Sequence, residues 1–267
     1  MELGIKGRVA VVTGGSKGIG KAIAKGLAAE GVNVVLLARG KEQLDKAAAD
    51  IGSQSKVRVL GIPTDITDTA SLKAAAETVA KEFGVVHIVV NNAGGPIRRM
   101  DRQINWPDTD WMDDVNLKTM GMLRTIQAFL PHMDKTGAGR IINISGASAS
   151  LVWNPALTHG INNAAMNHVT GYLAADLAAD QITVNAVVPG LVGTEGREIW
   201  AENMSKQQGK TKAEFLAEYC KKMGILSGRW ASMDEVADTV VFLASDRARY
   251  FTGAKIALDG GISLNAR

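Results

Sequence analysis

The stretch Thr13-Gly14-Gly15-Ser16-Lys17-Gly18-Ile19-Gly20 is the most informative part of the chain. It follows the apolar, β-branched segment Val9–Thr13 and opens the alanine-rich segment Ile19–Glu30, which has helical spacing. A glycine-rich turn between a strand and a helix is the usual setting of a phosphate-binding loop. The free N–H groups and the positive dipole end of the helix attract the anionic phosphate.

The glycines of this stretch have separate roles in such a loop. Gly14 permits the tight turn, Gly18 lets the backbone come close to a pyrophosphate, and Gly20 lets the helix pack against the strand. We therefore expect a dinucleotide to contact six residues of the loop: Gly14, Ser16, Lys17, Gly18, Ile19 and Gly20.

The end of the second predicted strand, Leu37-Ala38-Arg39, indicates which dinucleotide binds. A site for NAD places a carboxylate there, which binds the ribose 2′-hydroxyl. Here Arg39 occupies that position, and its guanidinium can pair with a 2′-phosphate, to which Lys17 adds a second cation. The pattern favours NADP(H) over NAD(H). The alternative is that both residues are ordinary solvated cations.

The rest of the chain continues the alternation of strand and helix. Short β-branched segments are typical of buried parallel strands: Val9–Thr13, Val32–Ala38, Val57–Pro63, Val86–Asn91, Arg140–Ser145, Thr183–Val188 and Lys255–Leu258. Alanine-rich segments with helical spacing lie between them: Ile19–Glu30, Lys41–Gly52, Thr69–Phe83, Met112–His132, Asn163–Ala179 and Asp234–Ala244. This order predicts an α/β fold: a Rossmann-type, doubly wound parallel sheet with helices on both faces.

Length and composition exclude several classes of protein. The 267 residues are 46% hydrophobic and 21% charged, which suits one large domain over residues 1–267 and excludes global disorder. The apolar runs are too short to span a membrane. The net charge of +3 is too small to indicate a nucleic-acid partner. We expect a cytoplasmic protein, because the chain has one cysteine, Cys220, and no signal stretch.

One region breaks the alternation. From Leu191 to Trp230 the sequence shows no strand pattern, whereas Ala213–Met223 is amphipathic with helical spacing. Ligands of open α/β sheets bind beyond the carboxyl ends of the strands, and this segment leaves such an end. We therefore expect residues 191–230 to form a helical lid over the substrate; the alternative is a surface decoration.

Further motifs make the chain resemble the short-chain dehydrogenase/reductase family over nearly its whole length. Besides the glycine-rich loop, the resemblance rests on Asp65-Ile66, Asn91-Asn92-Ala93-Gly94, Val115-Asn116-Leu117, Pro189-Gly190 with Thr194, and Asp259-Gly260-Gly261. It implies a single Rossmann-type domain that is usually assembled as a tetramer. Apolar residues on more than one face of the helices predicted at 112–132 and 163–179 also indicate a homotetramer or homodimer.

The resemblance also implies roles for individual residues. Asp65 and Ile66 would contact the adenine. Three residues would line the adenosine side of the site: Asn92, Ala93 and Gly94. Four would hold the nicotinamide carboxamide: Pro189, Gly190, Val192 and Thr194. Asn116 would support a water molecule in a proton relay.

The residues expected to carry the chemistry are replaced. Members of the family usually carry Tyr-x-x-x-Lys on the helix after the fifth strand and a Ser thirteen residues before the Tyr. The segment Ala164–Thr170 resembles the family's sequence just beyond the Lys, and counting back from it without a gap locates all three positions. They hold Gly146, His159 and Asn163 in place of Ser, Tyr and Lys.

His159 is then the candidate acid or base. It lies four residues before Asn163, hence on the same face of the helix, and a free imidazole titrates close to neutral pH. Asn163 can bond ribose hydroxyls without a charge, and Ser148 or Ser145 can polarise a substrate oxygen. The candidate catalytic residues are thus Asn116, Ser148, His159 and Asn163. A relic or packed surface histidine is about as good an interpretation of His159.

Three functions remain open on these residues. The first is an NADP(H)-dependent oxidoreductase acting on a small-molecule carbonyl or alcohol, favoured by the intact nicotinamide-side residues. The second is a lyase, hydratase or hydrolase on the same scaffold, favoured by the joint loss of Ser, Tyr and Lys. The third is a non-catalytic nucleotide-binding protein. Because fold alone does not determine function, the site has to discriminate between them.

Other residues give weaker indications. Arg98, Arg99 and Arg102 follow the Asn91–Gly94 motif and could receive a carboxylate or phosphate, or simply form a solvated loop. Trp153, Trp200 and Met204 could line an apolar substrate wall or pack the lid. We expect no metal, because His132 and His168 have no partners at the spacing of metal ligands.

Overall fold

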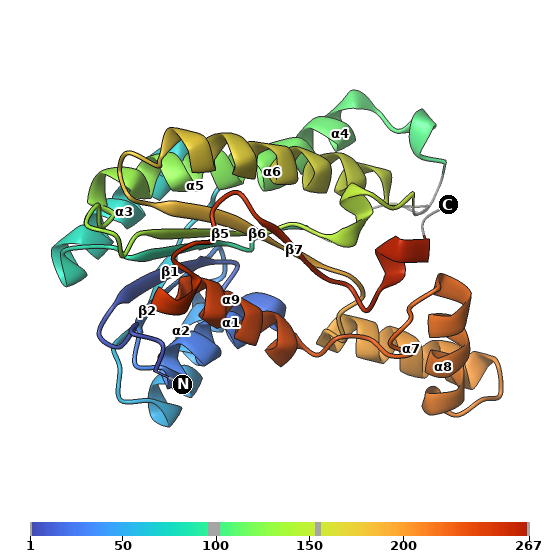
Figure 1. Cartoon of the computed structure of the whole chain (residues 1–267). Coiled ribbons are helices and arrows are strands. Elements are labelled where there is room, and N and C mark those ends of the chain that lie inside the picture. Colours follow the sequence, from blue (N-terminus) through green and yellow to red (C-terminus); the bar gives the residue numbers. More distant parts are fainter. Residues whose placement is uncertain (1, 96–101, 153–155, 266–267) are drawn as a thin grey trace.

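The computed structural model describes residues 2–95, 102–152 and 156–265. In this part of the chain, seven parallel strands form one sheet in the order β3-β2-β1-β4-β5-β6-β7 (Figure 1). Their bounds are β1 Val9–Thr13, β2 Asn33–Ala38, β3 Val59–Pro63, β4 Ile88–Asn91, β5 Arg140–Ile144, β6 Thr183–Pro189 and β7 Lys255–Leu258. The predicted Rossmann-type sheet is confirmed.

The central strands are apolar because both of their faces are covered. Every residue of β1, β4 and β5 is buried, whereas β3 and β7 at the two edges are partly exposed. Val11 in β1 lies between Val35 and Val89 on its two neighbours. The order of the strands reverses between β1 and β4, so their carboxyl ends flank the switch point at which such sheets bind ligands.

Helices cover both faces of this sheet (Figure 1). One face carries α1 Gly18–Ala29, α2 Lys41–Gln54 and α9 Met233–Ala244, and the other carries α3 Thr69–Phe83, α5 Gly121–Phe129 and α6 Leu157–Asp176. Helices α1 and α9 approach closely at Gly26, where a Cβ atom would lie 3.3 Å from Val241. A larger residue there would push the two helices apart.

The helix predicted at Met112–His132 is not one continuous α-helix. The structure instead has α4 Asp108–Val115, a π-helical turn at Asn116–Met120, then α5, and a final 3₁₀ turn at Leu130–His132. The helical segment begins before Met112. Pro107 directly precedes its first residue, and the carboxylates of Asp108 and Asp110 stabilise the positive dipole at its N-terminal end. The π turn widens the helix at the residues that face the site.

Helix α6 begins earlier than predicted, at Leu157 rather than Asn163, and ends at Asp176. Its first turns pack against the 3₁₀ turn Ala147–Ala149, because Gly160 carries no Cβ and the carbonyl oxygen of Ser148 lies 3.1 Å from where one would be. His159 and Asn163 therefore lie on the same regular helix.

Two helices leave the sheet beyond the carboxyl ends of the strands (Figure 1). Helix α7 Glu195–Gln207 and helix α8 Lys212–Met223 lie within the predicted lid, residues 191–230. A capping box between Thr211 and Glu214 begins α8. The two helices pack through an aromatic cluster whose members are Trp200, Phe215, Tyr219 and Trp230.

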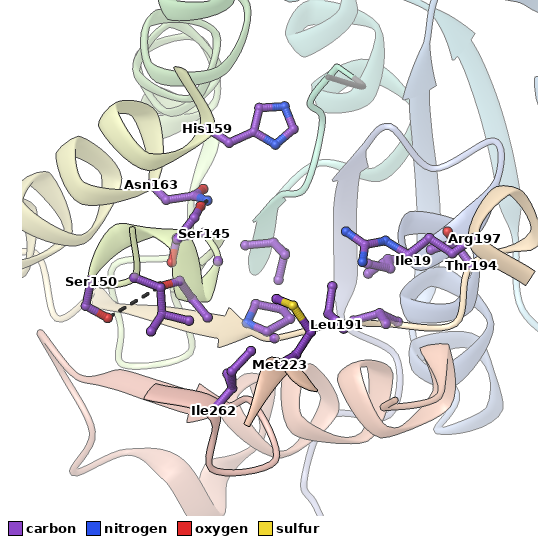
Figure 2. A pocket seen from close by; sticks show the side chains of 18 of the residues that line it. Ile19, Ser145, Ser150, His159, Asn163, Leu191, Thr194, Arg197, Met223 and Ile262 are labelled. Atoms are coloured by element: carbon purple, nitrogen blue, oxygen red, sulfur yellow. Dashed lines mark hydrogen bonds between the residues drawn. The ribbon is translucent and has the colours of Figure 1, made fainter. Parts of the chain in front are cut away.

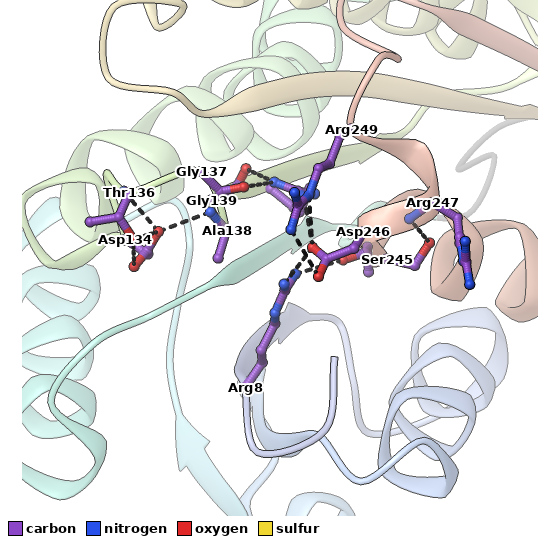
Figure 3. Close-up of polar contacts among 12 residues, drawn as sticks. Arg8, Asp134, Thr136, Gly137, Ala138, Gly139, Ser245, Asp246, Arg247 and Arg249 are labelled. Atoms are coloured by element: carbon purple, nitrogen blue, oxygen red, sulfur yellow. Dashed lines mark hydrogen bonds and ion pairs between the residues drawn. The ribbon is translucent and has the colours of Figure 1, made fainter. Parts of the chain in front are cut away.

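At the amino ends of the strands, opposite the α7–α8 pair, arginines surround Asp246 (Figure 3). Its carboxylate pairs with Arg8 at 2.6 Å, Arg249 at 3.1 Å and Arg140 at 3.5 Å. Burial raises the pKa of Asp246, but hydrogen bonds from Arg8 and Arg249 outweigh it and hold the pKa below its ordinary value. The cluster ties the amino ends of β1 and β5 to the 3₁₀ turn after α9.

No helix in the described ranges combines the length and apolar character that a membrane crossing requires.

Candidate functional site

The glycine-rich loop has the backbone that the sequence predicts. Gly14 and Gly18 adopt left-handed conformations, with φ values of 66° and 56°. A Cβ atom on Gly20 would lie 2.3 Å from the carbonyl oxygen of Gly14, so only glycine allows α1 to pack this closely. Lys17 precedes the first residue of α1 and no side chain caps this helix N-terminus. The N-terminal N–H groups of α1 therefore face the position expected for a pyrophosphate.

Thr13 and Asn92 connect this loop to the end of β4. The Thr13 hydroxyl accepts hydrogen bonds from the backbone N–H groups of Asn92 and Ala93, at 3.0 and 3.1 Å. The Asn92 amide in turn donates to the carbonyl oxygens of Thr13 and Gly14, at 3.0 and 3.4 Å. Asn92 thus holds the loop in shape from the neighbouring strand.

Of the residues expected at the adenosine end, Arg39 and Asp65 lie near enough for the charge of one to act on the other. Arg39 and Lys17 are exposed, whereas Asp65 is partly buried and its carboxylate accepts from the backbone and hydroxyl of Thr67, at 2.9 and 2.8 Å. The backbone hydrogen bond from Thr67, together with the charge of Arg39, lowers the pKa of Asp65. Ile66 is buried and packs against Gly121.

A cavity of about 570 Å³ opens beyond the carboxyl ends of β5 and β6 (Figure 2). In the figure, His159 and Asn163 project from α6, and Arg197 of α7 lies across the hollow from them. Eight residues predicted from the sequence line this cavity: Ile19, Ser148, His159, Asn163, Pro189, Gly190, Val192 and Thr194. The predicted nicotinamide side and the predicted acid/base therefore share one space.

Gly146 and Asn163 fit each other at the position where the resemblance predicts a serine. A Cβ atom on Gly146 would lie 2.7 Å from Nδ2 of Asn163, so the amide occupies the room that a larger residue would need. This Nδ2 donates a hydrogen bond to the hydroxyl of Ser148, at 2.9 Å. The hydroxyl of Ser145 donates to Asn167, at 2.7 Å. Of the two serines considered, Ser148 is thus the one coupled to Asn163.

Two basic residues of this cavity were not predicted from the sequence. Lys118 and Arg197 both line it. Burial lowers the pKa of Lys118 to about 8, although the charge of Asp114 acts in the opposite direction. Burial also lowers the pKa of Arg197. Lys118 lies two residues after Asn116, and this short distance from the motif was the one sign in the sequence that it could reach the site. The continuous helix expected there does not indicate whether Asn116 or Lys118 faces the cavity.

Asn116 begins the π turn, and its carbonyl oxygen accepts a hydrogen bond from Arg124 at 3.2 Å. Among the described residues that line the cavity, the π turn is represented by Lys118 and not by Asn116. The role expected for Asn116 remains a prediction. Trp200 and Met204 pack within the α7–α8 pair. Arg102 is exposed, and Arg98, Arg99 and Trp153 lie outside the described residues.

Comparisons with known proteins agree with the fold described above. Residues 14–263 match the family model described as enoyl-(acyl carrier protein) reductase. The chain is 33% identical to the 3-oxoacyl-[acyl-carrier-protein] reductase FabG of Haemophilus influenzae, over 98% of this chain and 100% of that protein. It is 34% identical to the oxidoreductase UcpA of Salmonella typhimurium, over 97% and 96% of the two chains.

Two solved structures are similar over almost the whole chain. The L-sorbose reductase of Gluconobacter frateurii, complexed with NADPH and L-sorbose, has a TM-score of 0.91 at 34% identity and covers 98% of this chain and 99% of its own. An NADPH-bound short-chain oxidoreductase of Pseudomonas aeruginosa PAO1, described as containing an atypical catalytic center, has a TM-score of 0.87 at 27% identity, with 97% of each chain covered.

Proposed function

Because the chain belongs to the short-chain dehydrogenase/reductase family, we propose that it is an NADP(H)-dependent oxidoreductase that interconverts a small-molecule carbonyl and its alcohol. The observation that carries the proposal is the cavity that joins Pro189 and Thr194, on the expected nicotinamide side, to His159. Similar proteins bound to NADPH support this choice of cofactor. The exposed cations Arg39 and Lys17 support it independently.

The cofactor, His159 and Ser148 have distinct tasks in this reaction. NADPH, when bound, supplies the hydride for the carbonyl carbon. His159 donates a proton to the carbonyl oxygen and takes it back in the reverse direction, because an imidazole exchanges protons near neutral pH. Ser148 accepts a hydrogen bond from Asn163 and so keeps its own O–H for the same oxygen. Helices α7 and α8 act as a lid that excludes water.

A histidine substitution tests the proposal. His159→Ala should lower the turnover of NADPH with an accepted ketone by about 10²- to 10⁴-fold, because the proton donor is lost. NADPH affinity, measured by fluorescence titration, should stay nearly unchanged. The matched control is His168→Ala, which removes an exposed histidine from the same helix and should leave turnover intact.

Two results would contradict parts of the proposal. Full turnover in His159→Ala would show that His159 is not the acid/base. Binding of NADPH without its oxidation by a broad panel of aldehydes and ketones would favour a non-redox enzyme on this scaffold.

A further inference from the structure

The side chain of Lys118 reaches across the site from the π turn to helix α6. Its stem passes Gly94, on which a Cβ atom would lie 3.8 Å from Cδ and 3.9 Å from Cε of the lysine. Its Nζ atom donates a hydrogen bond to Oδ1 of Asn163, at 2.5 Å. Lys118 therefore connects the loop after β4, on the nucleotide side, with the helix that carries His159.

The contact is part of a paired attachment between the two elements. Thr119, the next residue of the π turn, donates to Oδ1 of Asn162 at 2.5 Å, and Asn162 donates to the carbonyl oxygen of Thr158 at 2.9 Å. Asn162 and Asn163 are only 1% and 4% exposed, so both are fixed by their surroundings. Consecutive residues of the π turn thus bind consecutive residues of α6, which defines the place of the ammonium group.

The hydrogen bonds run in one direction from the ammonium. Lys118 donates to the carbonyl end of the Asn163 amide, and the amide nitrogen donates to the Ser148 hydroxyl. A positive charge at one end polarises such a chain and strengthens the donor at the other end. Gly146 is part of the arrangement, because a Cβ atom there would collide with the Asn163 amide.

An ammonium group has three donors, and Asn163 takes one of those on Lys118. The others can bind hydroxyl oxygens in the cavity that Lys118 lines. An asparagine side chain extended by a hydrogen-bonded ammonium has about the reach of a lysine side chain. The charge therefore stands at the distance from α6 at which a lysine at position 163 would hold it.

We propose that Lys118 supplies the active-site cation that position 163 lacks, binding hydroxyl groups of the bound cofactor directly and activating Ser148 through Asn163. Its effect on turnover rests on the proposed reductase function, whereas its effect on cofactor affinity does not. The pKa of about 8 keeps the amine mostly protonated at neutral pH.

The test compares three variants of the full chain. Lys118→Met and Lys118→Gln remove the charge, and the glutamine retains a donor for Asn163. The exchange Lys118→Asn/Asn163→Lys returns the ammonium to α6. Lys73→Met is the matched control, because Lys73 is an exposed lysine on α3. Circular dichroism establishes that each variant folds, and the readouts are the NADPH dissociation constant and ketone-dependent NADPH oxidation.

The charge-removing variants should bind NADPH about tenfold more weakly and turn over about 10²-fold more slowly, whereas Lys73→Met should match the wild type. The exchange should recover most of the lost affinity. Wild-type affinity and turnover in both Lys118→Met and Lys118→Gln would overturn the proposal, as would an exchange no better than Lys118→Gln. Weaker NADPH binding in a protein that reduces no carbonyl would support the cation and refute the reductase.

Discussion

At the scale of single residues, Gly146 and Asn163 depend on each other. Gly146 has an extended backbone with φ of 171°, which any residue adopts, so the glycine is required by space and not by conformation. The limiting contact is the 2.7 Å between a Cβ atom at 146 and Nδ2 of Asn163. Serine at position 146 would displace the amide from Ser148. Reinstating one residue of the usual triad alone therefore disturbs this site.

Arg39 determines the choice of cofactor in our proposal. Arg39→Ala should weaken NADPH binding by about 1–3 kcal/mol and leave NADH binding almost unchanged, because the charge-assisted contact involves the 2′-phosphate alone. Fluorescence titration with both cofactors measures the difference, and Lys46→Ala, an exposed cation on α2, serves as the control. An equal loss of affinity for NADPH and NADH would show that Arg39 does not bind the 2′-phosphate.

The partly buried amine of Lys118 makes stability depend on pH. Its folded-state pKa of about 8 is lower than the ordinary value of 10.5, so the unfolded chain binds more protons between these values and stability rises with pH there. Below pH 8 the charged amine is therefore destabilising. Asp114, His159 and Arg197 are the ionisable groups that share its surroundings.

Lys118→Met should consequently be more stable than the wild type at pH 7, by about 1–3 kcal/mol in the free energy of unfolding. The difference should shrink as the pH rises from 8 to 10.5, because the wild-type amine becomes neutral. Urea titrations at several pH values measure it. A constant difference across this range would contradict the assignment of the shift to Lys118.

At the scale of the elements, the carboxylate of Asp246 joins β1, β5 and the turn after α9. Asp246→Asn should lower the free energy of unfolding by about 2–4 kcal/mol, because several arginines then lose their counter-charge. Since the folded-state pKa is depressed, the contribution is present above pH 4 and declines as the pH falls below that.

Urea denaturation at neutral and acidic pH measures this effect. Arg249→Gln removes only the exposed ion pair with Asp246 and should cost less than about 1 kcal/mol. A loss in Arg249→Gln equal to that in Asp246→Asn would show that the buried arginines gain little from this carboxylate.

At the scale of the whole molecule, α6 presents an apolar stripe away from the sheet. Leu157, Ile161 and Tyr172 are 44%, 44% and 69% exposed at helical spacing. Two other apolar residues of this helix, Val169 and Leu173, pack partly into the core and so lie outside the exposed stripe. We therefore propose that α6 forms the contact of a homodimer within a homotetramer.

Sedimentation at micromolar concentration should show a tetramer or dimer, and Tyr172→Asp should shift it toward smaller species, because a charge is then buried in the interface. Asp176→Asn, a charge change at the end of the same helix, should not. A wild-type monomer at this concentration would contradict the proposed assembly.

Sequence patterns alone were sufficient to predict the architecture, which the structure confirms. Runs of β-branched residues specify buried strands. Gly14 and Gly18 are required by their left-handed backbone, and Gly20 by its close contact with Gly14. These are local patterns, so a single chain reveals them. A count along the chain likewise predicts Gly146, His159 and Asn163 at the positions of Ser, Tyr and Lys, and this assignment stays a prediction.

Which groups meet in the cavity depends on the packing of distant segments. Lys118 and Asn163 are separated by 45 positions, and their contact depends on a π turn that interrupts the helix predicted at 112–132. Helical periodicity assumes a regular turn, and the extra residue of a π turn rotates every side chain that follows. The position of the ammonium is therefore a property of how two elements pack, and neither segment specifies it alone.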